Sequence, residues 1–122
     1  MSSEFLNKAH ENLQAAQMCF EHGLYNACAN RTYYASLHAA IAALEHKHIK
    51  REKIDHKCIQ ADFSEKLITR QKVYPAKFKS YLPDMQMVRN IADYTDTQVS
   101  KKQAHLWLTR AKELIETVSN TQ

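Results

Sequence analysis

An arginine and a histidine seven residues apart are the side chains of this sequence best suited to carry chemistry. Arg31 and His38 lie in the stretch Tyr25–Leu44, YNACANRTYYASLHAAIAAL, which is apolar at most other positions. Seven residues make nearly two turns of an α-helix, so both side chains leave one face, about 10 Å apart along the axis. An imidazole moves protons near neutral pH and a guanidinium binds phosphate oxygens. The pair is therefore suited to acid–base chemistry on a phosphodiester.

The same face continues to Glu45, a further seven residues along. Three small residues lie on the same face: Ala27, Ala35 and Ala42. Such a stripe suits the close approach of another helix or of a phosphate. The spacing alone leaves a structural alternative, in which Arg31 pairs with Glu45 or a core carboxylate and His38 is a hydrogen-bonded interior histidine.

Composition predicts that helices position these residues. The chain has 122 residues with one glycine and two prolines, too few for the many tight turns of a β-sandwich or barrel. We expect one all-α domain over residues 1–122, an up-and-down bundle of four long helices and one shorter helix. A first helix capped by Ser2 or Ser3 ends at Gly23, so it forms an antiparallel hairpin with the second.

The sequence signals for the ends of the later helices are weaker. Residues 46–57 are polar and basic and predict a loop with frayed ends, and Asp55 near its end can cap a third helix. A fourth helix begins near Pro75, but Pro83 predicts a kink or break near Ser80–Leu82. Ser100, three residues before a glutamine, is a capping-box pattern that opens the last helix.

The distribution of charged and aromatic residues does not decide whether the chain binds a nucleic acid. The formal net charge is +4, and residues 47–79 hold ten Lys or Arg against four Asp or Glu. This segment could attract a polyanion or be an ordinary solvated surface. Tyr74, Phe78 and Tyr81 interleave with lysines, so they could form a stacking surface for single-stranded RNA or belong to the core.

No metal, cofactor or membrane is expected. The chain has three cysteines and no CxxC spacing: Cys19, Cys28 and Cys58. We therefore expect reduced thiols. Glu45 and His48 form a single Glu-x-x-His, whereas a carboxylate di-metal bundle needs two copies. The histidines of residues 46–57 lie in a polar, basic segment, so we expect their side chains to be solvated. The chain has no apolar run of transmembrane length and no signal-peptide pattern, so we expect a cytoplasmic protein.

The order of these residues resembles the minimal HEPN domain of prokaryotes over nearly the whole chain. The motif at its centre is an Arg, four to six residues and a His, met here by Arg31 and His38 with six between. The surrounding frame is Leu13…Ala16…Phe20…Gly23-Leu-Tyr25…Ala27, then Asp55-His-Lys, Arg89-Asn-Ile-Ala-Asp93-Tyr94 and Ala111-Lys-Glu-Leu-Ile.

The resemblance implies a homodimer, paired through the second helix, with two such motifs in a shared cleft. In active members the cleft is a metal-independent endoribonuclease site, where a ribose 2′-hydroxyl attacks the adjacent phosphate. His38 would then be the general acid and base, and Arg31 would stabilise the charge on phosphorus. Four further residues are candidates for binding the RNA substrate: Asn30, Thr32, Tyr34 and Glu45. Asp93 near Arg89 is more readily structural, paired with Arg31 or Arg89.

Many family members are toxins whose antitoxin is a small nucleotidyltransferase, the HEPN/MNT systems, and this is the function we expect. In some of them a tyrosine two residues after the motif histidine receives AMP, whereas this chain has Ala40 there. One alternative is a non-catalytic HEPN dimer that binds nucleotide or RNA or docks a partner. Another is a purely structural bundle, in which Arg31 and His38 satisfy each other in the interior.

Overall fold

The computed structural model describes residues 3–50 and 53–122. These residues form helices and no strand, which confirms the all-α prediction. The elements in chain order are α1 (Glu4–Glu21), α2 (Tyr25–His46), α3 (His56–Asp62), η1 (Phe63–Arg70), η2 (Ala76–Ser80), α4 (Tyr81–Tyr94) and α5 (Lys101–Asn120). None of the described helices is long and apolar enough to span a bilayer.

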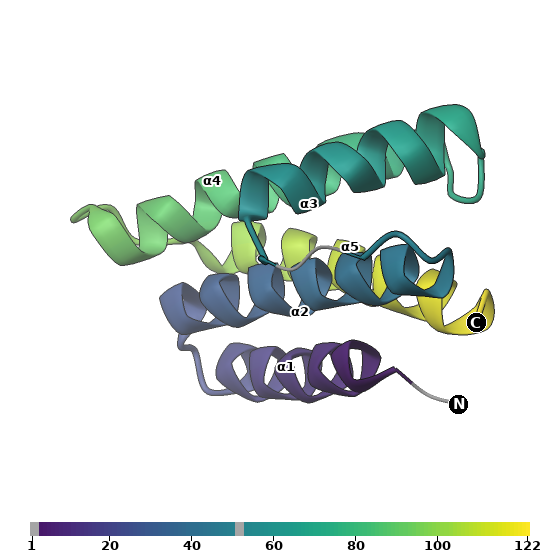
Figure 1. Cartoon of the computed structure of the whole chain (residues 1–122). Helices are drawn as coiled ribbons and strands as arrows, with labels where there is room; N and C mark the ends of the chain where they lie inside the picture. The colour runs from purple at the N-terminus through teal and green to yellow at the C-terminus, as the bar shows by residue number, and fades with distance from the viewer. Residues whose placement is uncertain (1–2, 51–52) are drawn as a thin grey trace.

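Helix α2 is the centre of the bundle (Figure 1). Helix α1 runs antiparallel beside it, and α2 also packs against α5, α4 and the α3–η1 segment. Most of its residues are buried, and its many alanines let four neighbours approach its backbone. The small-residue stripe serves this packing: Ala35 and Ala42 have no exposed surface. The close approach of another helix that this stripe suits is therefore made within the chain at these two alanines, whereas Ala27 is exposed.

Local side chains define the helix ends much as predicted. Ser3 caps α1 by accepting a hydrogen bond from the Phe5 amide at 3.1 Å, whereas Ser2 lies outside the described residues. Asp55 caps α3 through the Lys57 amide at 2.9 Å. Ser100 caps α5, but the side-chain carbonyl of Gln103 accepts from Trp107 at 3.1 Å, so the capping box is only half formed.

The third and fourth helices depart from regular α geometry. After Asp62 the backbone widens into the π-helical turns of η1, which the sequence pattern did not predict. The predicted break near Pro83 is present: the 3₁₀ turns of η2 end at Ser80 and α4 begins at Tyr81. Pro83 thus falls in the first turn of α4, where a missing N–H breaks no helical hydrogen bond.

The three aromatic residues that alternate with lysines belong to the core. Tyr74, Phe78 and Tyr81 are 5%, 1% and 6% exposed. Their rings pack on one another, with centroids 6.3 Å apart for Tyr74–Phe78 and 5.0 Å for Phe78–Tyr81. The alternative of a stacking surface for RNA is therefore wrong, because these rings are already covered by protein.

Gly23 separates α1 from α2 with a φ of +73°, in the left-handed region. An added Cβ would meet nothing within 4 Å, so the cost of a side chain there is backbone strain alone. We predict that Gly23→Ala lowers the free energy of unfolding by about 1–2 kcal/mol. Urea denaturation measures this, and Gly23→Asn should lose less because asparagine tolerates this conformation. Equal stability of all three chains would contradict the assignment.

Candidate active site around Arg31 and His38

The predicted pair lies on the one edge of α2 that its neighbours leave partly open. Arg31 and His38 are both half-buried, and Asn12 of α1 lies between them. The Asn12 side-chain carbonyl accepts a hydrogen bond from Arg31 Nη1 at 2.8 Å. Its Nδ2 is 3.2 Å from His38 Nδ1. One amide thus connects the guanidinium to the imidazole, and the two motif residues form a single cluster.

The contacts of Asn12 fix the position of the proton on His38. A guanidinium can only donate and a backbone carbonyl can only accept. The Asn12 oxygen must therefore face Arg31, while its nitrogen donates to the Lys8 carbonyl at 3.0 Å. The same nitrogen presents N–H to His38 Nδ1, which must act as the acceptor. His38 is consequently neutral, with its proton on Nε2.

The surroundings of His38 favour this neutral form. Burial lowers the pKa of His38 below its ordinary value, and the positive charges of Lys8, Arg31 and His56 lower it further. Phe5 and Tyr34 cover the ring, with centroids 5.7 and 6.4 Å away.

A second group of polar residues extends the cluster from Arg31 to α4. The Tyr34 ring contacts two guanidinium groups, with its centroid 5.2 Å from that of Arg31 and 5.4 Å from that of Arg89. Arg89 donates to the Tyr34 hydroxyl at 3.0 Å and pairs with Asp93 at 3.1 Å. Asn30 closes the group, because it accepts from Arg31 Nε at 2.9 Å and donates to Asp93 at 2.8 Å.

The model of the HEPN domain family matches residues 2–121. This chain belongs to the HEPN family. A search of curated proteins found no match. HEPN domains commonly dimerise, and membership suggests a ribonuclease or nucleotide-binding role.

Within this HEPN domain, the structure brings Asn30 and Tyr34 against Arg31 but places the other two substrate-binding candidates elsewhere. Thr32 is only 1% exposed, and its hydroxyl lies 3.8 Å from the Cys28 sulfur. It is on the core side of α2, away from the half-buried edge that carries Arg31 and His38.

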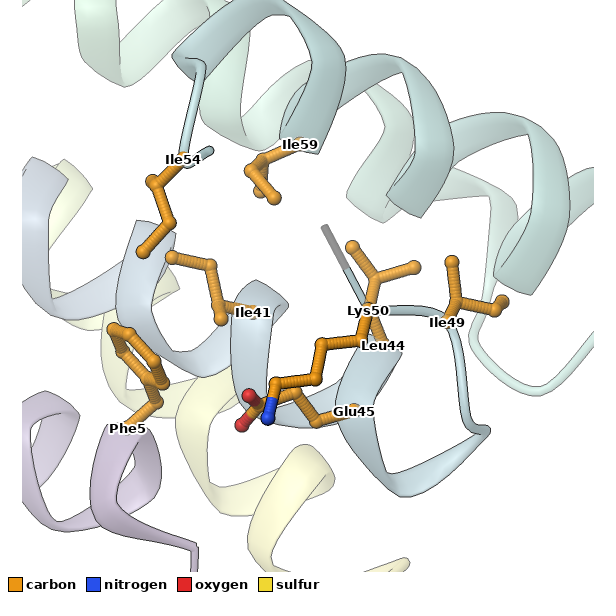
Figure 2. Close-up of a pocket in the computed structure, with 8 residues that line it drawn as sticks. All are labelled: Phe5, Ile41, Leu44, Glu45, Ile49, Lys50, Ile54 and Ile59. Atoms are coloured by element: carbon orange, nitrogen blue, oxygen red, sulfur yellow. The ribbon is translucent and has the colours of Figure 1, made fainter. Parts of the chain in front are cut away.

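Glu45 lies nearly two turns beyond His38 at the mouth of a separate cavity of about 100 Å³. In Figure 2 its carboxylate and the Lys50 side chain point toward one another beside an apolar interior. That interior is lined by Phe5, Ile41, Leu44, Ile49, Ile54 and Ile59. The structure therefore does not bring Glu45 to Arg31, whose guanidinium instead contacts Asn12 and Asn30. The alternative in which Arg31 pairs with Glu45 is wrong.

Three residues of the cluster were missed because they lie on other helices. Asn12 carries no charge and resembles any surface asparagine of an amphipathic helix. Arg89 was considered only as a partner for Asp93, and that pairing is confirmed. His56 was predicted to be solvated, yet its Nδ1 is 3.1 Å from the Tyr33 hydroxyl and its ring centroid is 5.9 Å from that of Tyr34. Asp55, as the cap of α3, was the available signal, since it places His56 at the first helical position.

The described residues hold no cluster of three or more His, Cys, Asp or Glu side chains arranged for a metal ion. The three cysteines are free thiols, as predicted.

The lowered pKa of His38 makes stability depend on pH. Protons bind this imidazole more tightly in the unfolded chain than in the folded one, so acid favours unfolding. We predict that the free energy of unfolding decreases as pH falls below 6.5, the ordinary histidine pKa, until the folded-state pKa of His38 is passed. His38→Gln should show a shallower decrease, measured by urea denaturation across this range. Identical slopes in the two proteins would contradict a buried neutral His38.

Proposed function

We propose that this HEPN domain is a metal-independent endoribonuclease whose catalytic residues are Arg31 and His38. The observation that supports this most directly is the Asn12 amide, which contacts both residues on a half-buried edge. A guanidinium and an imidazole held this way are within reach of one phosphodiester. The partly buried setting strengthens the interaction of the guanidinium with a phosphate relative to open water.

The chemistry requires two proton transfers. His38 takes the proton of a ribose 2′-hydroxyl, whose oxygen attacks the adjacent phosphorus. Arg31 donates hydrogen bonds to the non-bridging oxygens as negative charge builds on them. The bond to the 5′-oxygen breaks, and this oxygen takes up a proton. The products are a 2′,3′-cyclic phosphate and a 5′-hydroxyl end, with no net change in protons.

This scheme supports a homodimer across the open edge of α2. The entering and leaving oxygens lie on opposite sides of phosphorus in an in-line displacement, so one imidazole cannot serve both at once. A second copy would supply a second His38 as the acid. Because Ala35 and Ala42 are covered within the chain, the contact would use the edge that carries Arg31 and His38 together with neighbouring surface of α1 and α4.

Tyr34, Asn30 and Arg89 fit supporting roles in this proposal. Asn30 holds the Arg31 Nε from one side, which orients the guanidinium plane. Arg89 places a second guanidinium 5.4 Å from the centroid of the Tyr34 ring, which Arg31 also contacts. Two cations beside one aromatic ring suit the phosphates of an RNA strand.

We further propose that the nuclease is the toxin of a toxin–antitoxin pair and acts in the cytoplasm. A nuclease that needs no metal is not limited by the supply of a cofactor, and a protein partner is a direct means of restraint. The family resemblance suggests a small nucleotidyltransferase as that antitoxin. Co-purification of such a protein with this chain, and loss of RNA cleavage in the complex, would support the pairing.

We predict that the purified protein cleaves RNA in EDTA and leaves cyclic phosphate ends. Arg31→Ala and His38→Ala should each lower the rate by a factor of about 100 or more. Matched controls are Arg70→Ala and His10→Ala, which remove the same side-chain types from exposed positions. All four variants should keep their helical circular dichroism and their mass in solution.

Two results would contradict the nuclease. Equal cleavage by wild type and His38→Ala would place the activity in another site or another protein. No cleavage by any variant, together with retained RNA binding that Arg31→Ala abolishes, would establish the alternative of a non-catalytic RNA-binding dimer.

A further inference from the structure

The amide of Asn12 holds the two motif residues in states that do not match their catalytic roles. Its oxygen occupies one edge of the Arg31 guanidinium, which a phosphate would otherwise bind. Its amino group faces His38 Nδ1 and excludes a proton there. Asn12 is half-buried, so water competes weakly for these contacts.

Each catalytic form of His38 needs a proton on the nitrogen that Asn12 blocks. As a base acting through Nε2, the neutral imidazole must carry its proton on Nδ1. As an acid acting through Nε2, it must carry protons on both nitrogens. While Asn12 donates to Nδ1, His38 can be neither form and offers only a neutral N–H donor at Nε2.

We propose that Asn12 is a positioning residue that acts as a latch: it keeps His38 inactive until an anion draws Arg31 away from the Asn12 oxygen. Once that oxygen loses its partner, the remaining hydrogen bonds of the amide are those of its nitrogen to the Lys8 carbonyl and to His38 Nδ1. The amide is then held from one side only, so it can shift and Nδ1 can take up a proton from solvent. The identification of the anion as an RNA phosphate rests on the proposed function. The latch itself is a property of the free chain and can be tested with inorganic phosphate.

Thermodynamic linkage predicts the direction in which removal of Asn12 changes anion affinity and the pKa of His38. If the latch opposes both anion binding at Arg31 and protonation of His38, removing it must favour both. An asparagine that served as a phosphate ligand would have the opposite effect on affinity. If Asn12 only packed between helices, its substitution in a folded protein would change neither the phosphate affinity nor the pKa of His38.

The test is an NMR titration of the His38 ring in wild type and Asn12→Leu, with and without inorganic phosphate. Leucine has nearly the same size but cannot hydrogen-bond to either partner. We expect the pKa of His38 to be higher in the variant and phosphate to bind at least about fivefold more tightly. The charges that face His38 are Lys8 on α1, Arg31 on α2 and His56 on α3, and both proteins retain them.

Asn7→Leu is the matched control, because Asn7 is exposed on the same helix. It should leave the pKa of His38 and the phosphate affinity at their wild-type values. If Asn12→Leu does not fold, Asn12→Ala replaces it, since alanine also removes both hydrogen-bonding groups and adds no charge. The pKa of His38 and the affinity for phosphate should then rise above those of wild type.

A His38 pKa at or below the wild-type value in the folded variant, or weaker phosphate binding by Asn12→Leu, would overturn the latch. These readouts do not require RNA cleavage. A wild-type protein that shows the expected shifts but cuts no RNA would retain the latch and reject the nuclease.

Discussion

The enclosure of α2 is the constraint on which the rest of this structure depends. Four helical segments pack around a helix rich in alanine, and this leaves a single edge where a polar side chain can reach solvent. Residues seven apart share that edge because of helix periodicity. Arg31 and His38 therefore emerge together, and the first half of α1 and the second half of α4 form the sides of their surroundings. The position of the site follows from the packing of the core.

The electrostatics of this edge follow from the same packing. Lys8, Arg31, Arg89 and His56 come from four different elements and converge around Tyr34 and His38, while Asp93 offsets Arg89. Positive charge and burial both disfavour an imidazolium, so His38 is neutral. An anion bound at Arg31 would reverse this balance, because it compensates the charges that lower the pKa of His38.

Sequence periodicity and capping residues predicted the elements well, because these depend on neighbours within a few positions. Gly23, Asp55 and the break before Pro83 all act locally, and all three were correct. The orientation of the residues next to Arg31 in the sequence was harder to predict. Asn30 and Thr32 are each about 100° from it around the helix axis, and only the positions of the surrounding helices decide which one faces the core.

The Asn12 contact shows the limit of such reasoning most clearly. Its meaning depends on the register of α1 against α2, since a shift of one residue would remove the amide from both motif side chains. No local sequence pattern determines the register of α1 against α2. Once the helices are in place, however, simple donor and acceptor rules determine the orientation of the amide and the tautomer of the imidazole. With the Asn12 contacts, the guanidinium and the imidazole each have a partner, which is the stable arrangement for half-buried polar groups. A ligand that carries negative charge can replace the amide at Arg31, so the contacts that stabilise the site also couple its two residues to an incoming anion.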